Sequence, residues 1–151
     1  MNNRPIRLAV RGIILHENRV LLVNAWPPSK SRQQSDLWCA PGGGVEKGQS
    51  LPDNLAREIM EECGFHVDVG APCLINEFHN PDDGFHQVEV FFRCQMSGDM
   101  PSVWQDPEQV VTKRRFFGRD EVQALRLKPE SLRRIPWTDE IAYDALERLV
   151  K

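Results

Sequence analysis

Apolar and polar residues are arranged along much of the chain in patterns that predict β-strands. Residues 5–15 and 19–25 are rich in aliphatic and β-branched side chains, and the polar stretch 16–18 between them is typical of a hairpin turn. Further apolar runs predict strands at residues 65–69, 73–78, 85–96 and 110–117. Turn-forming residues separate these runs, with Gly-Ala-Pro at 70–72 and Asn-Pro-Asp-Asp-Gly at 80–84.

One stretch in the middle of the chain has helical periodicity instead. Leu55, Ile59 and Cys63 recur at a spacing of four residues, which places them on one buried face of a helix. Ser50 is suited to cap the start of this helix, and Gly64 is suited to end it in the left-handed conformation. Two more helices are predicted, at 119–125 and at 138–150, the latter capped by Thr138 with an apolar face of Ile141, Ala142, Ala145, Leu146 and Leu149.

The order of these elements predicts the fold class. Strands precede and follow the central helix, and a second long helix closes the chain. This order predicts a mixed β-sheet between helices, which is an α/β/α sandwich. A length of 151 residues suits one domain spanning residues 1–151.

Composition narrows the class of protein further. The net charge is −3 and there is no long basic run, which argues against the wrapping of long nucleic acid. No apolar run reaches membrane-spanning length, and the N-terminus lacks a signal-peptide pattern. The four cysteines, Cys39, Cys63, Cys73 and Cys94, form no CxxC pair and do not have the spacing of a zinc site. We therefore expect reduced, packed thiols and a cytoplasmic location for the protein.

The polar face of the central helix carries the most informative chemistry. Glu58, Glu61 and Glu62 stand at positions i, i+3 and i+4, so their like charges share one helix face. A bound cation would relieve their repulsion, and hard carboxylate oxygens suit Mg²⁺ or Mn²⁺. The alternative is a solvated helix surface. The glycine-rich loop at 41–44 favours the metal site, because its free backbone can approach a ligand closely.

Residues 43–65 resemble the Nudix box, whose pattern is G-x5-E-x7-R-E-U-x-E-E-x-G-U with U a bulky apolar residue. The chain departs from this pattern at one place, because Gln49 stands where the family usually has glutamate. The preceding stretch, 37–43, resembles the strand and glycine loop that lead into the box. The matching positions are Gly43, Arg57, Glu58, Ile59, Glu61, Glu62, Gly64 and Phe65.

The resemblance implies both the α/β/α sandwich and roles for particular residues. Similar proteins hydrolyse a nucleoside diphosphate linked to another group, with Glu61 and Glu62 matching the main metal ligands. Glu58 matches a further ligand or the base that activates water, and Arg57 is expected to orient one of these carboxylates through a bidentate pair. The backbone carbonyl of Gly42 is a further candidate ligand.

The resemblance also implies a role for an acidic residue in a loop. In similar proteins a glutamate after the long strand joins the box carboxylates as ligand or base. Glu108 is the nearest candidate by position, with Asp106 behind it. Glu89, in the middle of the preceding strand, either faces solvent or points toward the metal.

Several residues outside the box are candidates for substrate binding. Lys30 and Arg32 lie in a polar loop that should be near the site, where they could meet phosphates or simply be incidental surface charges. Arg11 lies inside the first strand, either at a surface position or in contact with a phosphate or base. Trp26 could stack on a base, although tryptophan is more often a packing residue.

Two classes of function follow from these residues. The first is a Mg²⁺- or Mn²⁺-dependent pyrophosphohydrolase acting on a small nucleoside di- or triphosphate derivative, with capped or triphosphorylated RNA 5′ ends as the alternative substrate. The second is a non-catalytic module of the same fold that binds a nucleotide, a reading that Gln49 supports. The sequence is compatible with a homodimer and does not determine the oligomeric state.

Overall fold

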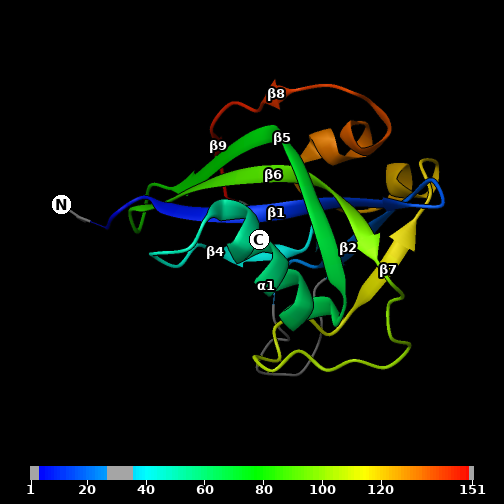
Figure 1. Cartoon of the computed structure of the whole chain (residues 1–151). Coiled ribbons are helices and arrows are strands. Elements are labelled where there is room, and N and C mark those ends of the chain that lie inside the picture. Colours follow the sequence, from blue (N-terminus) through cyan, green and yellow to red (C-terminus); the bar gives the residue numbers. More distant parts are fainter. Residues whose placement is uncertain (1–3, 27–35, 150–151) are drawn as a thin grey trace.

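The computed structural model describes residues 4–26 and 36–149 (Figure 1). In these residues the helical elements are α1 (Leu51–Cys63) and the 3₁₀ turns η1 (Glu121–Ala124), η2 (Glu130–Arg133) and η3 (Ile135–Trp137). The strands are β1 (Arg7–His16), β2 (Arg19–Asn24), β3 (Trp38–Cys39), β4 (Gly42–Gly44), β5 (His66–Asn80), β6 (Phe85–Ser97), β7 (Arg114–Phe117), β8 (Ala142–Tyr143) and β9 (Glu147–Arg148).

These strands form one mixed sheet, as the sequence predicts. Its main order is β3-β2-β1-β6-β5-β8, with β4 paired to β1, β7 to β2 and β9 to β5. β1 and β2 form the expected hairpin, with Glu17 and Asn18 turning in the left-handed region. β1 runs parallel to β6, and β6 runs antiparallel to β5, so that these three long strands lie side by side in Figure 1.

Two strand predictions differ from the structure in extent. Apart from Phe65, the runs 65–69 and 73–78 belong to one long strand, β5, in which the stretch around Pro72 shifts the register against β6 without breaking the pairing. The strand expected at 110–117 is limited to β7, because the side chain of Asn24 accepts hydrogen bonds from the backbone N–H groups of Thr112 and Lys113, each at 2.9 Å.

Helix α1 begins and ends where the sequence predicts. The Ser50 hydroxyl accepts a hydrogen bond from the N–H of Asp53 at 3.1 Å, which satisfies one of the free donors of the first turn. Gly64 ends the helix at φ 82°, and its N–H donates to the carbonyl of Met60. The spacing-four residues Leu55, Ile59 and Cys63 are all buried, so the predicted apolar face is confirmed.

The sheet has a hydrophobic core on each face. Helix α1 packs against Val10 and Ile14 of β1, while the turns η2 and η3 bring Leu132 and Ile135 against Ile13 on the opposite face. Successive strand residues point to opposite faces, which explains how one strand contributes to both cores. The sandwich with a mixed sheet between helical layers is confirmed, although its second layer is built from 3₁₀ turns.

The prediction of a closing helix at 138–150 is wrong. In the described part of this segment the chain is extended, and β8 and β9 pair in parallel with β5. The N–H groups of Asp144 and Leu149 donate to carbonyls of β5 at 2.8 and 2.7 Å, so the segment covers an otherwise open sheet edge. Ile141 and Leu146, expected to face the core, are exposed. The helix expected at 119–125 is the single turn η1.

Two expectations from composition can be compared with the fold. The four cysteines are unpaired, with Cys63, Cys73 and Cys94 buried, as expected for packed thiols. Among the described residues, no helix combines the length and the apolar character that crossing a bilayer would require.

Candidate active site

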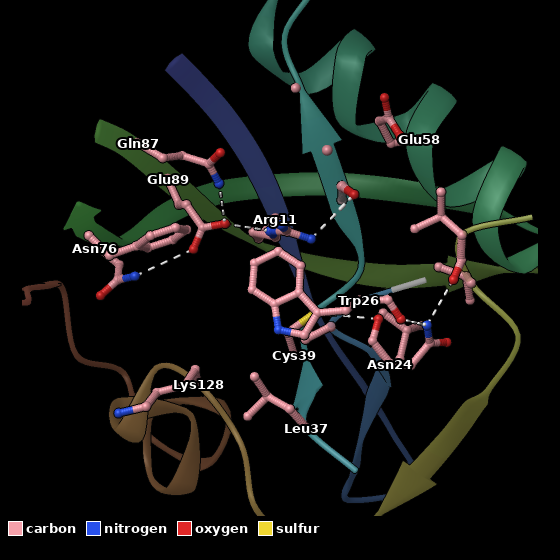
Figure 2. Close-up of a pocket in the computed structure, with 18 of the residues that line it drawn as sticks. Arg11, Asn24, Trp26, Leu37, Cys39, Glu58, Asn76, Gln87, Glu89 and Lys128 are labelled. Atoms are coloured by element: carbon pink, nitrogen blue, oxygen red, sulfur yellow. Dashed lines mark hydrogen bonds and ion pairs between the residues drawn. The ribbon is translucent and has the colours of Figure 1, made fainter. Parts of the chain in front are cut away.

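A cavity of about 560 Å³ lies where β1, β4, β5 and β6 meet the acidic face of α1. The loop before β7 and the segment around Lys128 complete its walls. Figure 2 shows Glu58 on one side of this cavity, Asn76 on the other, and Arg11 between them. The acidic helix face and the polar residues of the sheet therefore meet in one space.

The glycine strand β4 allows the helix carboxylates to reach this space. Gly42 has φ 151°, and a β-carbon there would lie 1.9 Å from the carbonyl oxygen of Val10, so only glycine fits. A β-carbon on Gly43 would lie 2.6 Å from a carboxylate oxygen of Glu58. The N–H of Gly42 donates to Glu62 Oε2 at 3.2 Å. The loop is thus shaped to receive two of the three predicted glutamates.

Burial and mutual repulsion raise the pKa values of two of these carboxylates. Loss of hydration raises the pKa of Glu62 to about 8, although Arg11 and the Gly42 N–H act in the opposite direction. Burial also raises the pKa of Glu58, and the charges of Glu61 and Glu108 raise it further. A cation placed among these groups would stabilise their charged forms.

The raised pKa of Glu62 predicts how the stability of the metal-free protein depends on pH. A carboxyl whose pKa rises from 4.5 to about 8 on folding binds its proton more tightly in the folded state. Its stabilising contribution is therefore complete below pH 4.5 and is lost as the pH rises through about 8. In EDTA, we expect the free energy of unfolding to fall over this window more in the wild type than in Glu62→Gln, by on the order of 2–4 kcal/mol.

Urea unfolding at both ends of the pH window measures this difference. Glu17→Gln, on the exposed hairpin turn, is the matched control and should keep the wild-type dependence. Equal pH dependence in the wild type and in Glu62→Gln would contradict the prediction.

Arg57 holds the acidic face together, but not through the expected bidentate pair. Its Nη1 lies 3.4 Å from Glu46, 3.3 Å from Glu58 and 3.7 Å from Glu61, so one nitrogen faces three carboxylates. Its Nη2 donates to Asn54 Oδ1 at 2.7 Å. Arg57 is therefore placed to orient Glu58 and Glu61 together.

Arg11 and Glu89 lie in the cavity wall and bind each other. Arg11 Nε donates to Glu89 Oε2 at 2.7 Å, and its Nη1 donates to the carbonyls of Ala40 and Gly42 at 3.2 and 3.3 Å. Glu89 is 4% exposed, so it does not lie on a solvated face, and its carboxylate lines the same cavity as the helix glutamates. Arg11 is not a surface residue either, because these contacts tie it to the glycine loop.

The remaining predicted residues differ in their exposure and in whether they line the cavity. Glu108 is exposed, lines the cavity and lies near enough to Glu58 to affect its pKa. Gln49, which departs from the family pattern, is exposed on its loop and does not line the cavity. Trp26 lines the cavity. Lys30 and Arg32 lie outside the described residues.

Sequence reasoning missed Asn54, and it considered Asp106 only as a candidate acid behind Glu108, not as a residue that shapes the loop. Asn54 is buried, donates to three carbonyls of the 46–50 loop and accepts from the N–H of Glu46. Asp106 accepts three backbone N–H groups, those of Glu108, Val110 and Val111, and so shapes the loop that carries Glu108. A buried amide within a polar helix turn has no sequence signal of its own, because its partners are loop carbonyls.

The acidic residues supply the right donors for a metal ion, but they do not surround a point. Among the described residues, no three acidic, histidine or cysteine side chains converge closely enough to hold an ion. Their donor atoms are nevertheless carboxylate oxygens beside a backbone carbonyl, which is the set that Mg²⁺ and Mn²⁺ prefer. The residues present fit a hard divalent cation, with side-chain adjustment on binding.

Comparison with known sequences places this arrangement in a family. A family model described as NUDIX domain matches residues 5–138. A MutT-like protein of Streptomyces ambofaciens is 28% identical over 128 residues, which are 80% of this chain and 73% of that protein. Diphosphoinositol polyphosphate phosphohydrolase 3-alpha of Mus musculus is 32% identical over 101 residues, which are 67% of this chain and 56% of that protein. The chain thus spans about half of this mouse relative, and it spans 40% of the YjhB protein of Bacillus subtilis, to which it is 31% identical over 91 residues.

Solved structures agree on the fold. A MutT protein from Bacillus halodurans is 23% identical and superimposes with a TM-score of 0.71 over 91% of this chain and 87% of that one. A UDP-X diphosphatase is also 23% identical, with a TM-score of 0.64 over 89% of this chain and 59% of that one. Because the NUDIX domain model covers most of the chain and these structures share its architecture, the protein belongs to the Nudix family.

Proposed function

We propose that the protein is a metal-dependent pyrophosphohydrolase that cleaves the diphosphate linkage of a nucleoside diphosphate derivative, in particular a small nucleoside di- or triphosphate. The observation that carries this proposal is the meeting of the α1 carboxylates with the glycine strand in one cavity, where burial raises the pKa values of Glu58 and Glu62. The family of the chain and the activity named for its mouse relative support the same reaction class.

The proposed cofactor is Mg²⁺ or Mn²⁺. Glu58, Glu61 and Glu62 would hold it, with the carbonyl of Gly42 and the carboxylate of Glu108 as further oxygen donors. When bound, such a cation neutralises phosphate charge and lowers the pKa of water. Glutamates on a rigid helix suit this task, because their backbone positions are fixed by the packing of the buried face.

The chain's own residues have separate tasks in this reaction. Glu58 is the proposed base, and its carboxylate accepts the proton of the attacking water. Glu58 lies beside Gly43 and lines the cavity, so its carboxylate faces the space that substrate and water would enter. Arg57 holds Glu58 and Glu61 in place. Arg11 holds the glycine loop through the carbonyls of Ala40 and Gly42.

The alternative of a non-catalytic nucleotide-binding module depends on Gln49. That residue is exposed and does not line the cavity, whereas Glu58, Glu61 and Glu62 all do. This position argues against a direct part for Gln49 in metal binding and supports the enzyme over the binding module. We also propose that residues 1–151 act as one domain and that the unpaired cysteines reflect a reducing, cytoplasmic setting.

Turnover of a nucleotide panel tests the proposed function. Nucleoside di- and triphosphates, dinucleoside diphosphate derivatives and 5′-triphosphorylated or capped RNA are incubated with Mg²⁺ or Mn²⁺, and products are separated by chromatography. We expect hydrolysis of a small nucleotide that stops in excess EDTA and returns when metal is added back. Glu62→Gln should lose this activity, while the hairpin control Glu17→Gln should keep it. Full hydrolysis in EDTA, or none with either metal, would contradict the proposal.

A further inference from the structure

The last turn of helix α1 accepts hydrogen bonds from side chains that lie far along the chain. A helix leaves its final carbonyls without partners inside the helix, and the last turn of α1 has no basic residue of its own to donate to them. The indole N–H of Trp104 donates to the carbonyl of Glu61 at 2.8 Å. The guanidinium of Arg114 donates to the carbonyl of Cys63. The segment between β6 and β7 is therefore attached to the end of the helix.

Trp104 also covers the glycine that ends the helix. A β-carbon on Gly64 would lie 2.4 Å from Cδ2 of the Trp104 indole, so the ring rests where a side chain would otherwise be. Trp104 lies at the surface and is 40% exposed, yet its ring has both this contact and the hydrogen bond to Glu61. Two separate contacts therefore hold Trp104 at the helix end.

The loop that Trp104 attaches to the helix carries Glu108. We call residues 98–113 the Glu108 loop, and in Figure 1 it runs from β6 past α1 to β7. The second half of this loop is attached to β2 through the side chain of Asn24. The tip is shaped by the carboxylate of Asp106, which accepts the N–H of Glu108 at 3.0 Å. Trp104 lies before this tip and attaches the first half of the loop to α1.

These attachments place Glu108 relative to the glutamates of the helix. Glu108 lines the same cavity as Glu58 and Glu61. Its charge lies close enough to Glu58 to raise the pKa of that carboxyl. The hydrogen bond of Trp104 ends on the backbone of Glu61, which is itself one of the proposed ligands. The distance between the loop acid and the helix acids therefore depends on the contact at the helix end.

Building on the proposed function, we propose that Trp104 is a positioning residue that holds the Glu108 loop against α1, so that the Glu108 carboxylate meets the cation bound by the helix glutamates. In the described part of the chain Trp104 does not line the cavity, so it acts through Glu108 and not by contact with the cation or the nucleotide. Removal of a side chain that orients a metal ligand typically lowers metal affinity or activity by about 10- to 100-fold.

Mn²⁺ binding to the nucleotide-free protein tests this proposal. Electron paramagnetic resonance measures free Mn²⁺ as the protein is titrated, which requires no turnover. We expect Trp104→Ala and Glu108→Gln each to weaken Mn²⁺ binding by about 10-fold or more. The double variant should bind no more weakly than the weaker single variant, because without Trp104 the Glu108 carboxylate no longer reaches the cation.

A second variant isolates the hydrogen bond. Trp104→Phe keeps an aromatic ring over Gly64 but has no N–H to donate to the carbonyl of Glu61. We expect it to weaken Mn²⁺ binding by about 2- to 10-fold, which lies between the wild type and Trp104→Ala. Trp104→Phe with Glu108→Gln replaces the first cycle if circular dichroism shows that Trp104→Ala is partly unfolded.

Val103→Ala is the matched control. Val103 precedes Trp104 on the same loop and is 86% exposed, so its removal should leave Mn²⁺ affinity at the wild-type value. Additive losses in the double variant would show that Trp104 acts independently of Glu108 and would overturn the proposal. Wild-type Mn²⁺ affinity in Trp104→Ala or in Glu108→Gln would overturn it as well.

The nucleotide assay separates this proposal from the proposed function. A protein that shows the coupling in Mn²⁺ affinity but hydrolyses no nucleotide would sink the proposed function alone. Metal-dependent hydrolysis by the wild type, combined with additive losses of Mn²⁺ affinity, would sink the positioning role of Trp104 alone.

Discussion

Glu58→Gln should lower kcat by about 10²–10⁴-fold at saturating Mg²⁺, while KM for the nucleotide changes little. Glutamine keeps the shape of the side chain and an oxygen for contacts, but it does not take a proton from water. Glu58 lies beside Gly43 and lines the cavity together with Glu61 and Glu62. Initial rates over a range of nucleotide and metal concentrations measure both constants.

Companion variants separate the base from the metal ligands. Glu61→Gln and Glu62→Gln should weaken metal affinity and rate together, because their proposed task is to hold the cation. Glu108→Gln tests the rival assignment, since that residue also lines the cavity. Near-normal kcat in Glu58→Gln with a large loss in Glu108→Gln would show that the loop supplies the base.

Arg11→Met should destabilise the protein by about 3–5 kcal/mol and reduce kcat as well. The substitution leaves Glu89 charged and 4% exposed with no cation beside it. It also removes the donors to the carbonyls of Ala40 and Gly42, so the glycine loop loses the side chain that holds it. Urea unfolding gives the change in stability, and the nucleotide assay gives the change in rate.

A double-mutant cycle checks that the pair itself is responsible. Glu89→Leu alone should also destabilise strongly, and Arg11→Met with Glu89→Leu should recover part of the loss, because no unpaired charge then remains. Arg134→Met is the control, since Arg134 and Glu140 form a pair that is 52% and 41% exposed and should contribute less than about 1 kcal/mol. Additive single losses in the cycle would contradict a coupled pair.

The candidate site was predictable from sequence where its residues are close along the chain. Glu58, Glu61 and Glu62 share one helix, so the 3.6-residue period alone puts them on one face. The glycines of β4 were recognisable because close backbone approach excludes side chains. The partners of Arg11, Glu89 and Asn76 were not predictable, because these residues lie on three different strands, with Glu89 13 residues from Asn76 and 78 residues from Arg11 in sequence.

The same distinction, between local and distant partners in the sequence, separates the parts of the fold that were predictable from those that were not. The β1–β2 hairpin and helix α1 are specified by adjacent residues, through turn conformations, the Ser50 cap and the Gly64 terminator, so the sequence alone determined them. The segment 138–149 has the apolar spacing of a helix, yet it is extended in the structure. Only the tertiary structure decided this, because the edge of β5 offers unpaired carbonyls to the N–H groups of Asp144 and Leu149. A local pattern reports which conformations a segment can adopt, whereas the choice between them depends on hydrogen-bonding partners that folding brings from elsewhere in the chain.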